Sequence, residues 1–441
     1  RGEAEGASPG FVSRSNSTQL NRLLDAFLYY GTRLDGLGAD VDFTAGYSYE
    51  DSNGEFPYFE AQGLSFDYLG TSGVPAAEET RQSIWVDESR LIAFFGRTNV
   101  SLNDRYMMTL SLRRDGSSKF GPDEQWGLFP SAGFAWRVSQ ESFMQDMDFL
   151  SDLKLRASWG VNGNQSFGNY LQFPSYDIGE PTAQYQFGDD FVTTIRPTAV
   201  DRGIKWEETT SYNFGIDYGL ADNRFTGSIE YYFKETEDLI FRVPVPAGTF
   251  TSNFVTTNIG TLENQGFEFS IDAAVFEGEG GGFWWNAGFN ASTNDNQIVE
   301  INPFGSGSEI ILVGGISGGV GNNIQVLTPG VEAYSFYVYR HRLDADGRPV
   351  YADLDGDQSI DDAERLLMYE DVNGDGIINQ DDRVPFESPA PNWIFGHTSR
   401  MGFGNFDAGF TVRAHLGNYV YNNIASNNGH YRALSYVVAP N

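Results

Sequence analysis

The stretch Ser211–Lys234 reads SYNFGIDYGLADNRFTGSIEYYFK and decides the fold class. Apolar side chains take every second position on both sides of a short polar turn, Ala221–Arg224. A period of two is the period of a β-strand, so the stretch predicts a β-hairpin with one apolar and one polar face. We expect lipid to contact the apolar face, which carries Tyr212, Phe214, Ile216, Phe225, Ile229 and Tyr231. We expect Asp217, Ser228 and Glu230 to face an aqueous lumen.

The same alternation recurs along the chain and predicts an all-β fold. Regular segments begin at Val41, Tyr106, Ala132, Leu153, Phe267, Phe283 and Phe406, and less regular ones cover Leu23–Thr32, Leu91–Leu102 and Trp393–Phe403. We count about twelve strands that are long enough to cross a bilayer at a tilt. The prediction is therefore an antiparallel transmembrane β-barrel, or about twelve strands of a larger one.

Short and long connections alternate between these strands. Short polar turns are expected at Asp35–Gly38, Asn103–Arg105, Ala221–Arg224, Glu277–Gly282 and Gly404–Asn405, with a slightly longer one around Gln140–Asp152. Long segments are expected at Asp51–Asp87, Asp115–Gln125, Val161–Trp206, Glu235–Gly260 and Asp295–Asn392. Outer-membrane barrels have short periplasmic turns and long extracellular loops, and the chain matches this arrangement.

Composition narrows the possible functions. Aromatic residues make up 15% of the chain, and 51 residues are glycine, a mixture typical of β-rich membrane proteins. Sixty Asp and Glu against 28 Lys and Arg give a formal net charge of -32, which argues against a nucleic-acid partner and favours divalent cations as counter-ions. There is no cysteine, so thiolate metal sites and Cys nucleophiles are excluded. No apolar run of about 18 residues predicts a membrane-spanning helix.

A large soluble β-sandwich would also show alternation, and the placement of charge separates the two folds. On the regular strands no Asp, Glu, Lys or Arg lies on the apolar face, whereas the other face carries many charges. A Lys or Arg in contact with lipid at the midplane costs about 2–4 kcal/mol, so such a face excludes charge. The many Gly, Asn and Ser residues on the opposite face favour the barrel.

The sharpest motif lies in the longest loop, at residues 351–383. Oxygen ligands occur there at positions 1, 3, 5, 7, 9 and 12 of two consecutive segments, the spacing with which an EF-hand-type loop surrounds Ca²⁺. The first set is Asp353, Asp355, Asp357, Ser359, Asp361 and Glu364, and the second is Asp371, Asn373, Asp375, Ile377, Asn379 and Asp382. Position 6 is Gly376 in the second copy and Gln358 in the first, so the second copy matches better. Chance is a competing explanation, because an acidic solvated loop often contains DGD turns.

No catalytic constellation stands out, and we expect no enzyme activity. The four histidines lack metal-ligand spacing, and the glycine-rich segment Gly314–Gly319 lacks the strand-to-helix context of a phosphate loop. Aromatic residues of the long segments are candidates for stacking on sugar rings, although loops also bury aromatics for their own packing. They are Phe56, Tyr58, Phe59, Tyr170, Phe173, Tyr185 and Phe187.

Four segments resemble, in the same order, the SusC-like TonB-dependent outer-membrane transporters of the Bacteroidetes type. The most specific is SLRRDGSSKFGPDEQWGLFPSAGFAWRVSQE, Ser111–Glu141. The others are LSDLKLRASWGVNGNQ (Leu150–Gln165), NIGTLENQGFEFSI (Asn258–Ile271) and YADLDGDQSIDDAER (Tyr351–Arg365). Barrels of this class have about 22 strands around a plugged lumen. The resemblance therefore implies that residues 1–441 are the central and late part of such a barrel.

The resemblance also implies a function in the bacterial outer membrane. Its members import large nutrients, typically oligosaccharides or peptides, with force supplied by TonB and with a SusD-like surface lipoprotein on the extracellular loops. One alternative is a TonB-dependent receptor for a metal chelate or cobalamin. Another is a soluble secreted β protein that binds calcium or glycans.

Overall fold

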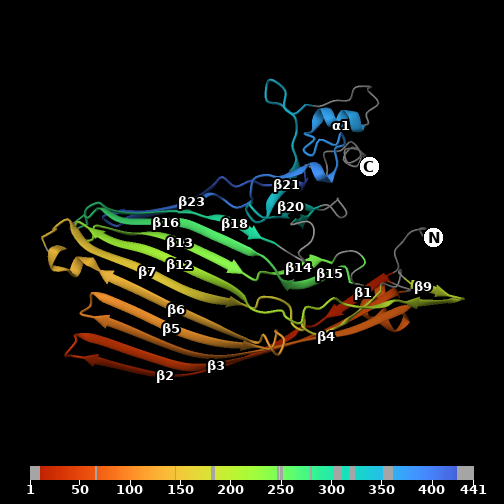
Figure 1. Ribbon diagram of the computed structural model, residues 1–441, viewed down its shortest axis with the longest axis horizontal. Helices are drawn as coiled ribbons and strands as arrows, with labels where there is room; N and C mark the ends of the chain where they lie inside the picture. Colours follow the sequence, from red (N-terminus) through yellow and green to blue (C-terminus); the bar gives the residue numbers. More distant parts are fainter. Residues whose placement is uncertain are drawn as a thin grey trace.

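The structure is a computed structural model that describes residues 10–64, 67–144, 146–179, 184–245, 248, 252–278, 281–301, 310–316, 323–350 and 361–424. Its main feature is a 14-stranded antiparallel sheet (Figure 1). Twelve of these strands follow one another in chain order across the sheet: β2 (Thr18–Leu34), β3 (Ala39–Leu64), β4 (Glu79–Leu102), β5 (Tyr106–Ser117), β6 (Trp126–Arg137), β7 (Leu150–Asn164), β12 (Glu207–Leu220), β13 (Phe225–Glu237), β16 (Thr261–Phe276), β17 (Trp284–Thr293), β23 (Trp393–Phe403) and β24 (Phe406–Leu416). The predicted all-β fold is confirmed, and so is the count of about twelve long strands.

The shorter elements lie in the connections. Two short strands, β1 (Gly10–Ser15) and β18 (Asp295–Glu300), pair with β3 and β16 and complete the sheet. The other strands are β8 (Tyr176–Ile178), β9 (Gln184–Phe187), β10 (Asp190–Thr193), β11 (Ile195–Pro197), β14 (Ile240–Pro244), β15 (Phe254–Asn258), β19 (Ile311–Gly315), β20 (Asn323–Leu327), β21 (Ser335–Tyr339) and β22 (Arg383–Pro385). The helices are α1 (Asp362–Met368) and the 3-10 turns Asp67–Ala76, Val138–Gln140, Ser142–Met144 and Gln380–Asp382. Within the described ranges no helix has the length and apolarity needed to cross a membrane.

The register of β12 with β13 confirms the two faces of the predicted hairpin. Phe214 pairs with Tyr231 and Ile216 with Ile229, so the apolar residues of both strands share one face. Asp217 pairs with Ser228 on the other face. Phe214 is 54% exposed, which is far more than a soluble core residue would be and fits a surface that contacts lipid.

The five predicted short turns and the slightly longer β6–β7 connection join neighbouring strands at one end of the sheet, and the long connections lie at the other end (Figure 1). The tight turns use left-handed backbone at Asn103, Asp104, Ala221, Asp222 and Asn223, with φ between 51° and 61°. Consecutive residues with positive φ match the right-handed twist of paired strands, and Asn and Asp tolerate this conformation best. The predicted asymmetry between turns and loops is therefore confirmed.

One predicted loop is wrong. Most of the segment Asp51–Asp87 is not a loop, because β3 and β4 remain paired far beyond the other strands, from Asp51 opposite Arg90 to Gln62 opposite Glu79. β1 adds a third strand there by pairing with Tyr58–Leu64 of β3. The sequence shows no clean alternation in this part since a ribbon that extends past the bilayer meets water on both faces. The aromatic residues Phe56, Tyr58 and Phe59 thus lie on a strand.

Candidate functional site

The polar face of the sheet carries a charge network that connects three strands. Arg156 on β7 donates from Nε to both carboxylate oxygens of Asp217 on β12, at 3.1 and 3.0 Å. Its Nη2 donates to Asp217 at 2.7 Å and to Glu230 on β13 at 2.8 Å. Lys154 Nζ lies 2.6 Å from Asp217. The carboxylates and cations therefore neutralise one another on the face that the sequence assigns to the lumen.

These side chains are partly exposed, with 23–32% of their surface accessible. A two-pronged Arg–carboxylate pair fixes direction as well as charge, because the planar guanidinium aligns with the carboxylate plane. Two cations and two carboxylates balance within the network, so this patch of the polar face carries no net charge.

An aromatic cluster anchors the loops at the opposite end from the turns. Phe120, Phe129, Ile204 and Trp206 are all buried and come from the β5–β6 connection, β6 and the segment before β12. The Trp206 ring lies 4.8 Å from Phe120 and 5.3 Å from Phe129 between centroids, and its Nε1 donates to the Gln125 carbonyl at 3.1 Å. The cluster packs the end of the long β7–β12 connection against the loop end of the sheet.

Lys119 lies beside this aromatic cluster in the β5–β6 loop. Its Nζ donates to the backbone carbonyls of Gln165 at 3.2 Å and Phe167 at 2.9 Å. Burial lowers the pKa of Lys119, and the carboxylates of Asp87 and Glu50 oppose that shift. The lysine therefore serves the packing of two loops, and nothing in its surroundings indicates a catalytic base.

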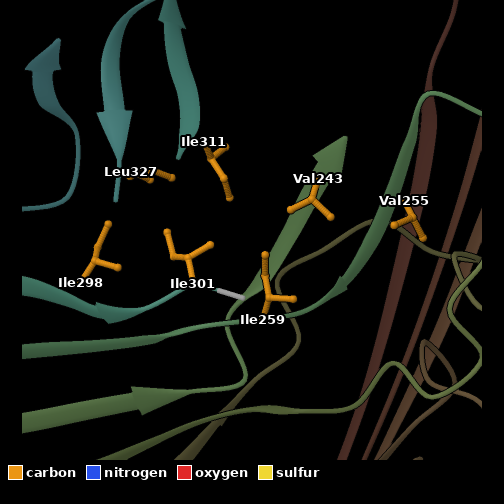
Figure 2. Packing of buried hydrophobic residues seen from close by; sticks show 7 residues of the cluster. All are labelled: Val243, Val255, Ile259, Ile298, Ile301, Ile311 and Leu327. Atoms are coloured by element: carbon orange, nitrogen blue, oxygen red, sulfur yellow. The ribbon is translucent and has the colours of Figure 1, made fainter. Parts of the chain in front are cut away.

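A second apolar cluster joins the β13–β16 connection to the long insertion between β17 and β23. Figure 2 shows its side chains converging from the β14–β15 hairpin, β18 and its end, β19 and β20. The members are Val243, Val255, Ile259, Ile298, Ile301, Ile311 and Leu327. Because most of them are almost fully buried, this cluster fixes the base of the insertion on the rim of the sheet.

The second calcium-like copy has a well-defined loop geometry. Asp371 accepts hydrogen bonds from the backbone N–H groups of Gly374 and Gly376, at 2.7 and 2.9 Å. Asp382, at position 12, is fully buried and accepts from the N–H groups of Val372 and Asn379, both at 2.8 Å. The Asn379 N–H is the main cause of a lowered pKa at Asp382, and burial acts in the opposite direction.

Of the remaining predicted ligands in this loop, Asn373, Asp375 and Ile377 are exposed and Asn379 is half-buried. Asn373 Oδ1 accepts from the Asp375 N–H at 2.9 Å, and Asp375 Oδ1 accepts from the Ile377 N–H at 2.8 Å. Gly374 and Gly376 have φ of 75° and 81°, so both glycines occupy the left-handed region that a sharp turn requires. Every predicted residue of the second copy thus lies in one compact turn.

The first copy is described only at its end. Asp353, Asp355, Asp357 and Ser359 lie outside the described residues. Asp361 caps α1 by accepting from the Glu364 N–H at 2.9 Å, and Glu364 accepts from the Asp361 N–H at 3.1 Å. Positions 9 and 12 of both copies therefore form the same reciprocal capping box, with Asn379 and Asp382 in the second. Among described residues no group of three or more His, Asp or Glu side chains converges on a point that would hold a metal ion.

Sequence reasoning missed the contacts of the polar face. Arg156, Asp217 and Glu230 were each recognisable as polar-face residues from alternation alone. Their mutual contact depends on cross-strand register, with Gly215 opposite both Arg156 and Glu230. The alternation of apolar and polar residues along the chain does not specify that register.

Comparison with known proteins identifies the architecture. A family model described as "TonB dependent receptor-like, beta-barrel" matches residues 3–438. The chain belongs to this family. β-Barrels of the family lie in the outer membrane, so the predicted localisation and the SusC-like assignment are confirmed, the latter by the relatives below.

The relatives of this TonB-dependent receptor barrel include TonB-dependent receptor SusC of Bacteroides thetaiotaomicron, 38% identical over 354 residues, which are 80% of this chain and 34% of that protein. TonB-dependent receptor P26 of Formosa agariphila is 32% identical over 391 residues, 86% of this chain and 37% of that protein. The chain thus spans about a third of the length of the curated relatives it matches.

Solved structures support the same fold. The RagAB peptide transporter aligns with a TM-score of 0.74 at 19% identity over 94% of this chain and 43% of that one. The RagAB peptide importer in its open-open state gives 0.73 at 20% identity over 92% and 42%. At this identity the likeness concerns the fold of the barrel wall.

Proposed function

We propose that this chain forms part of the wall of a SusC-like TonB-dependent importer of a large nutrient, an oligosaccharide or a peptide. The main support for this proposal is the asymmetry of the sheet. One end has short turns, the other has long connections held by two buried apolar clusters, and a polar face with mutually paired charges runs between them. Substrate would be captured at the loop end and pass along the polar face.

Two partners follow from the proposal. TonB would supply force through parts of the protein outside the described residues, and a SusD-like lipoprotein would sit on the loop end. The polar face supports this role because the charges of Arg156 and Lys154 pair with those of Asp217 and Glu230, which leaves partly exposed hydrogen-bonding groups along the wall. No catalytic chemistry is part of the proposal.

The test is uptake by cells that carry the gene encoding this chain. Labelled oligosaccharides and peptides are supplied to cells with and without the gene, and with and without an uncoupler that removes the proton gradient. We expect accumulation of one class only when both gene and gradient are present. Accumulation that persists without the gene, or that ignores the uncoupler, contradicts the proposal. Uptake of a metal chelate or cobalamin instead would favour the alternative receptor class.

We also propose that the acidic insertion binds calcium through the two predicted ligand sets. The support is the shared capping box at positions 9 and 12 and the left-handed glycines of the second copy. Bound Ca²⁺ would neutralise carboxylates that otherwise repel one another, and it would stiffen the insertion at the loop end.

The calcium proposal is tested by titration of the purified protein in detergent after treatment with a chelator. Asp375→Asn removes a ligand charge and keeps the oxygen that accepts the Ile377 N–H. We expect this variant to bind Ca²⁺ at least about tenfold more weakly, with Asp189→Asn, in the β9–β10 turn, as the matched control. Absence of calcium uptake by the unchanged protein would refute the proposal.

A further inference from the structure

Three arginines continue the outward, apolar face of the sheet at its loop end. Arg22 of β2 and Arg90 of β4 lie on either side of Asp51 of β3 in the strand register. Arg114 of β5 lies opposite Phe94 of β4, which is four residues, or about 13 Å, nearer to the short turns than Arg90. Alternation puts all three arginines on the face of Phe94, whose side chain is 52% exposed toward lipid.

The level of these positions matches the outer boundary of a bilayer. Asp51 is 12 residues from Ala39, where β3 leaves its short turn. At about 3.3 Å per residue and a tilt of about 40°, Asp51 lies about 30 Å from the turns, whereas the apolar band of an outer-membrane barrel is about 25 Å tall. On the turn side of this level the ring centroid of Phe94 lies 5.3 Å from that of Tyr47 and 6.4 Å from that of Trp126. Aromatic residues mark the edge of the apolar band, so the arginines lie at the level of the lipid headgroups.

Arg22 and Arg90 share a single carboxylate. Arg90 Nε lies 3.0 Å from one oxygen of Asp51, and Arg22 Nη1 lies 3.3 Å from the other. The Asp51 side chain is 8% exposed, whereas those of Arg22 and Arg90 are 65% and 61% exposed. Two cations on one carboxylate leave an excess positive charge, and the remaining N–H donors of both guanidiniums are accessible from the lipid side.

Arg114 adds a third cation nearer to the apolar band. Its guanidinium carbon lies 4.8 Å from the centroid of the Trp126 ring. Among the described residues, this exposed side chain contacts the ring and no carboxylate. A cation over an aromatic ring keeps its hydrogen-bond donors available, and a charge beside lipid is costly unless it is compensated. Arg114 therefore requires an anion on the lipid side, and its long side chain can extend toward the headgroups.

The outward face carries the opposite charge on other strands. At the loop end of β12, β13 and β16, Glu208 lies opposite Glu237, and Glu235 lies opposite Glu263. Glu208 and Glu237 are each 12 residues from their short turn, as Asp51 is from its own. The excess of positive charge is therefore local to β2–β5, within a chain whose net charge is -32.

We propose that Arg22, Arg90 and Arg114 bind the phosphate groups of anionic lipids in the outer leaflet, at a site separate from the path of imported solute. Two observations select a lipid as the occupant. The patch is continuous with the surface that contacts lipid, and its charge complements a phosphate at headgroup level. The planar guanidinium offers two parallel N–H donors to phosphate oxygens. Glu88, two residues farther out on β4, ends the patch on the aqueous side.

The experiment measures lipid binding to the purified full-length protein in a neutral detergent by native mass spectrometry. The probes are dioleoylphosphatidic acid and dioleoylglycerol, which has the same acyl chains and no phosphate, with inorganic phosphate as a competitor. The variants are Arg90→Gln and Arg114→Gln, of which the second leaves both ion pairs of Asp51 in place. The matched control is Arg97→Gln, which removes an exposed charge from the polar face of β4. Circular dichroism verifies that each variant keeps its β structure.

We expect the protein to bind dioleoylphosphatidic acid and not dioleoylglycerol. The affinity should fall about fivefold in Arg90→Gln and in Arg114→Gln, and it should be unchanged in Arg97→Gln. Equal binding of the two lipids overturns the site, and so does an unchanged affinity in Arg114→Gln. An equal loss in Arg97→Gln contradicts it as well, because overall charge would then explain the binding.

Inorganic phosphate separates the two sources of the same anion. We expect it not to displace the lipid at equal concentration, because it gains no contact with the apolar face. Displacement would identify a site for a free anion and overturn the lipid as the occupant. Gradient-dependent uptake is measured separately in cells, so the lipid site and the import function stand or fall independently.

Discussion

Gly215 on β12 lies opposite Arg156 on β7, and a β-carbon at Gly215 would come within 3.0 Å of the guanidinium carbon of Arg156. The guanidinium occupies the space that a side chain would take, and this position lets it contact Asp217 and Glu230 together. The charge network therefore requires a residue without a side chain at position 215. It gives a steric reason for glycine between polar-face residues of a strand.

Gly215→Ala is expected to push the guanidinium away from its two carboxylates and to destabilise the sheet by about 1 kcal/mol or more. Gly133→Ala is the matched control, since a β-carbon at Gly133 on the same face would meet Ser158 at an ordinary 3.9 Å. The measurement is thermal unfolding in detergent followed by circular dichroism. Equal stability of the two variants would show that the Arg156 position does not depend on Gly215.

Ile216→Asp is expected to impair assembly in the membrane far more than Ser228→Asp. Ile216 is on the face that contacts lipid, where a carboxylate is destabilising by less than the roughly 2–4 kcal/mol of a Lys or Arg at the bilayer midplane, whereas Ser228 is on the polar face opposite Asp217. The amount of folded protein in outer-membrane fractions measures the difference. Equal tolerance of both substitutions contradicts the assigned orientation of β12 and β13.

Trp206→Ala is expected to release the β7–β12 connection from the rim. The side chain is 6% exposed and contacts Phe120 and Phe129, and removal of a buried tryptophan costs about 3–5 kcal/mol. Cleavage by a broad-specificity protease should become faster within residues 165–206. Phe187→Ala, in the same connection but 67% exposed, should leave the cleavage rate unchanged.

The loop closed by Asp382 is expected to lose protection in acid. Its pKa is lowered in the folded protein by the Asn379 N–H and then by the Val372 N–H, so the stabilisation is present above the ordinary value of 3.8 and is lost as pH falls through the folded pKa. Hydrogen exchange of residues 371–383, corrected for intrinsic rates and measured without calcium, should therefore rise steeply below about pH 3.8. In Asp382→Asn this step should be absent. A step that persists in the variant would assign the transition to another carboxylate.

Much of the fold was predictable because each long strand has one face toward lipid and the other toward water. The face in contact with lipid carries apolar residues such as Phe214 and Ile216, and the face in contact with water carries Asp217 and Glu230. The sequence therefore alternates between apolar and polar residues. The prediction failed between Asp51 and Asp87, where β3 and β4 remain paired beyond the other strands. Both faces of this extension are in contact with water, so its residues show no regular alternation of apolar and polar side chains. The calcium-like loop shows the same limit: the spacing predicted Asp371 and Asp382 as ligands, and it did not reveal that the Asp382 carboxylate is fully buried.

The sequence by itself determined the strand period, the polarity of each face, the sides of the turns and loops, and the family resemblance, since all of these are local along the chain. Only the tertiary structure decided which residues meet. Arg156 and Glu230 are 74 positions apart, and Tyr170 and Glu88 are 82 apart, yet both pairs are in contact. Strand register and loop packing set these contacts, and both depend on the summed fit of many residues. The charge network on the polar face therefore forms only when the sheet is assembled.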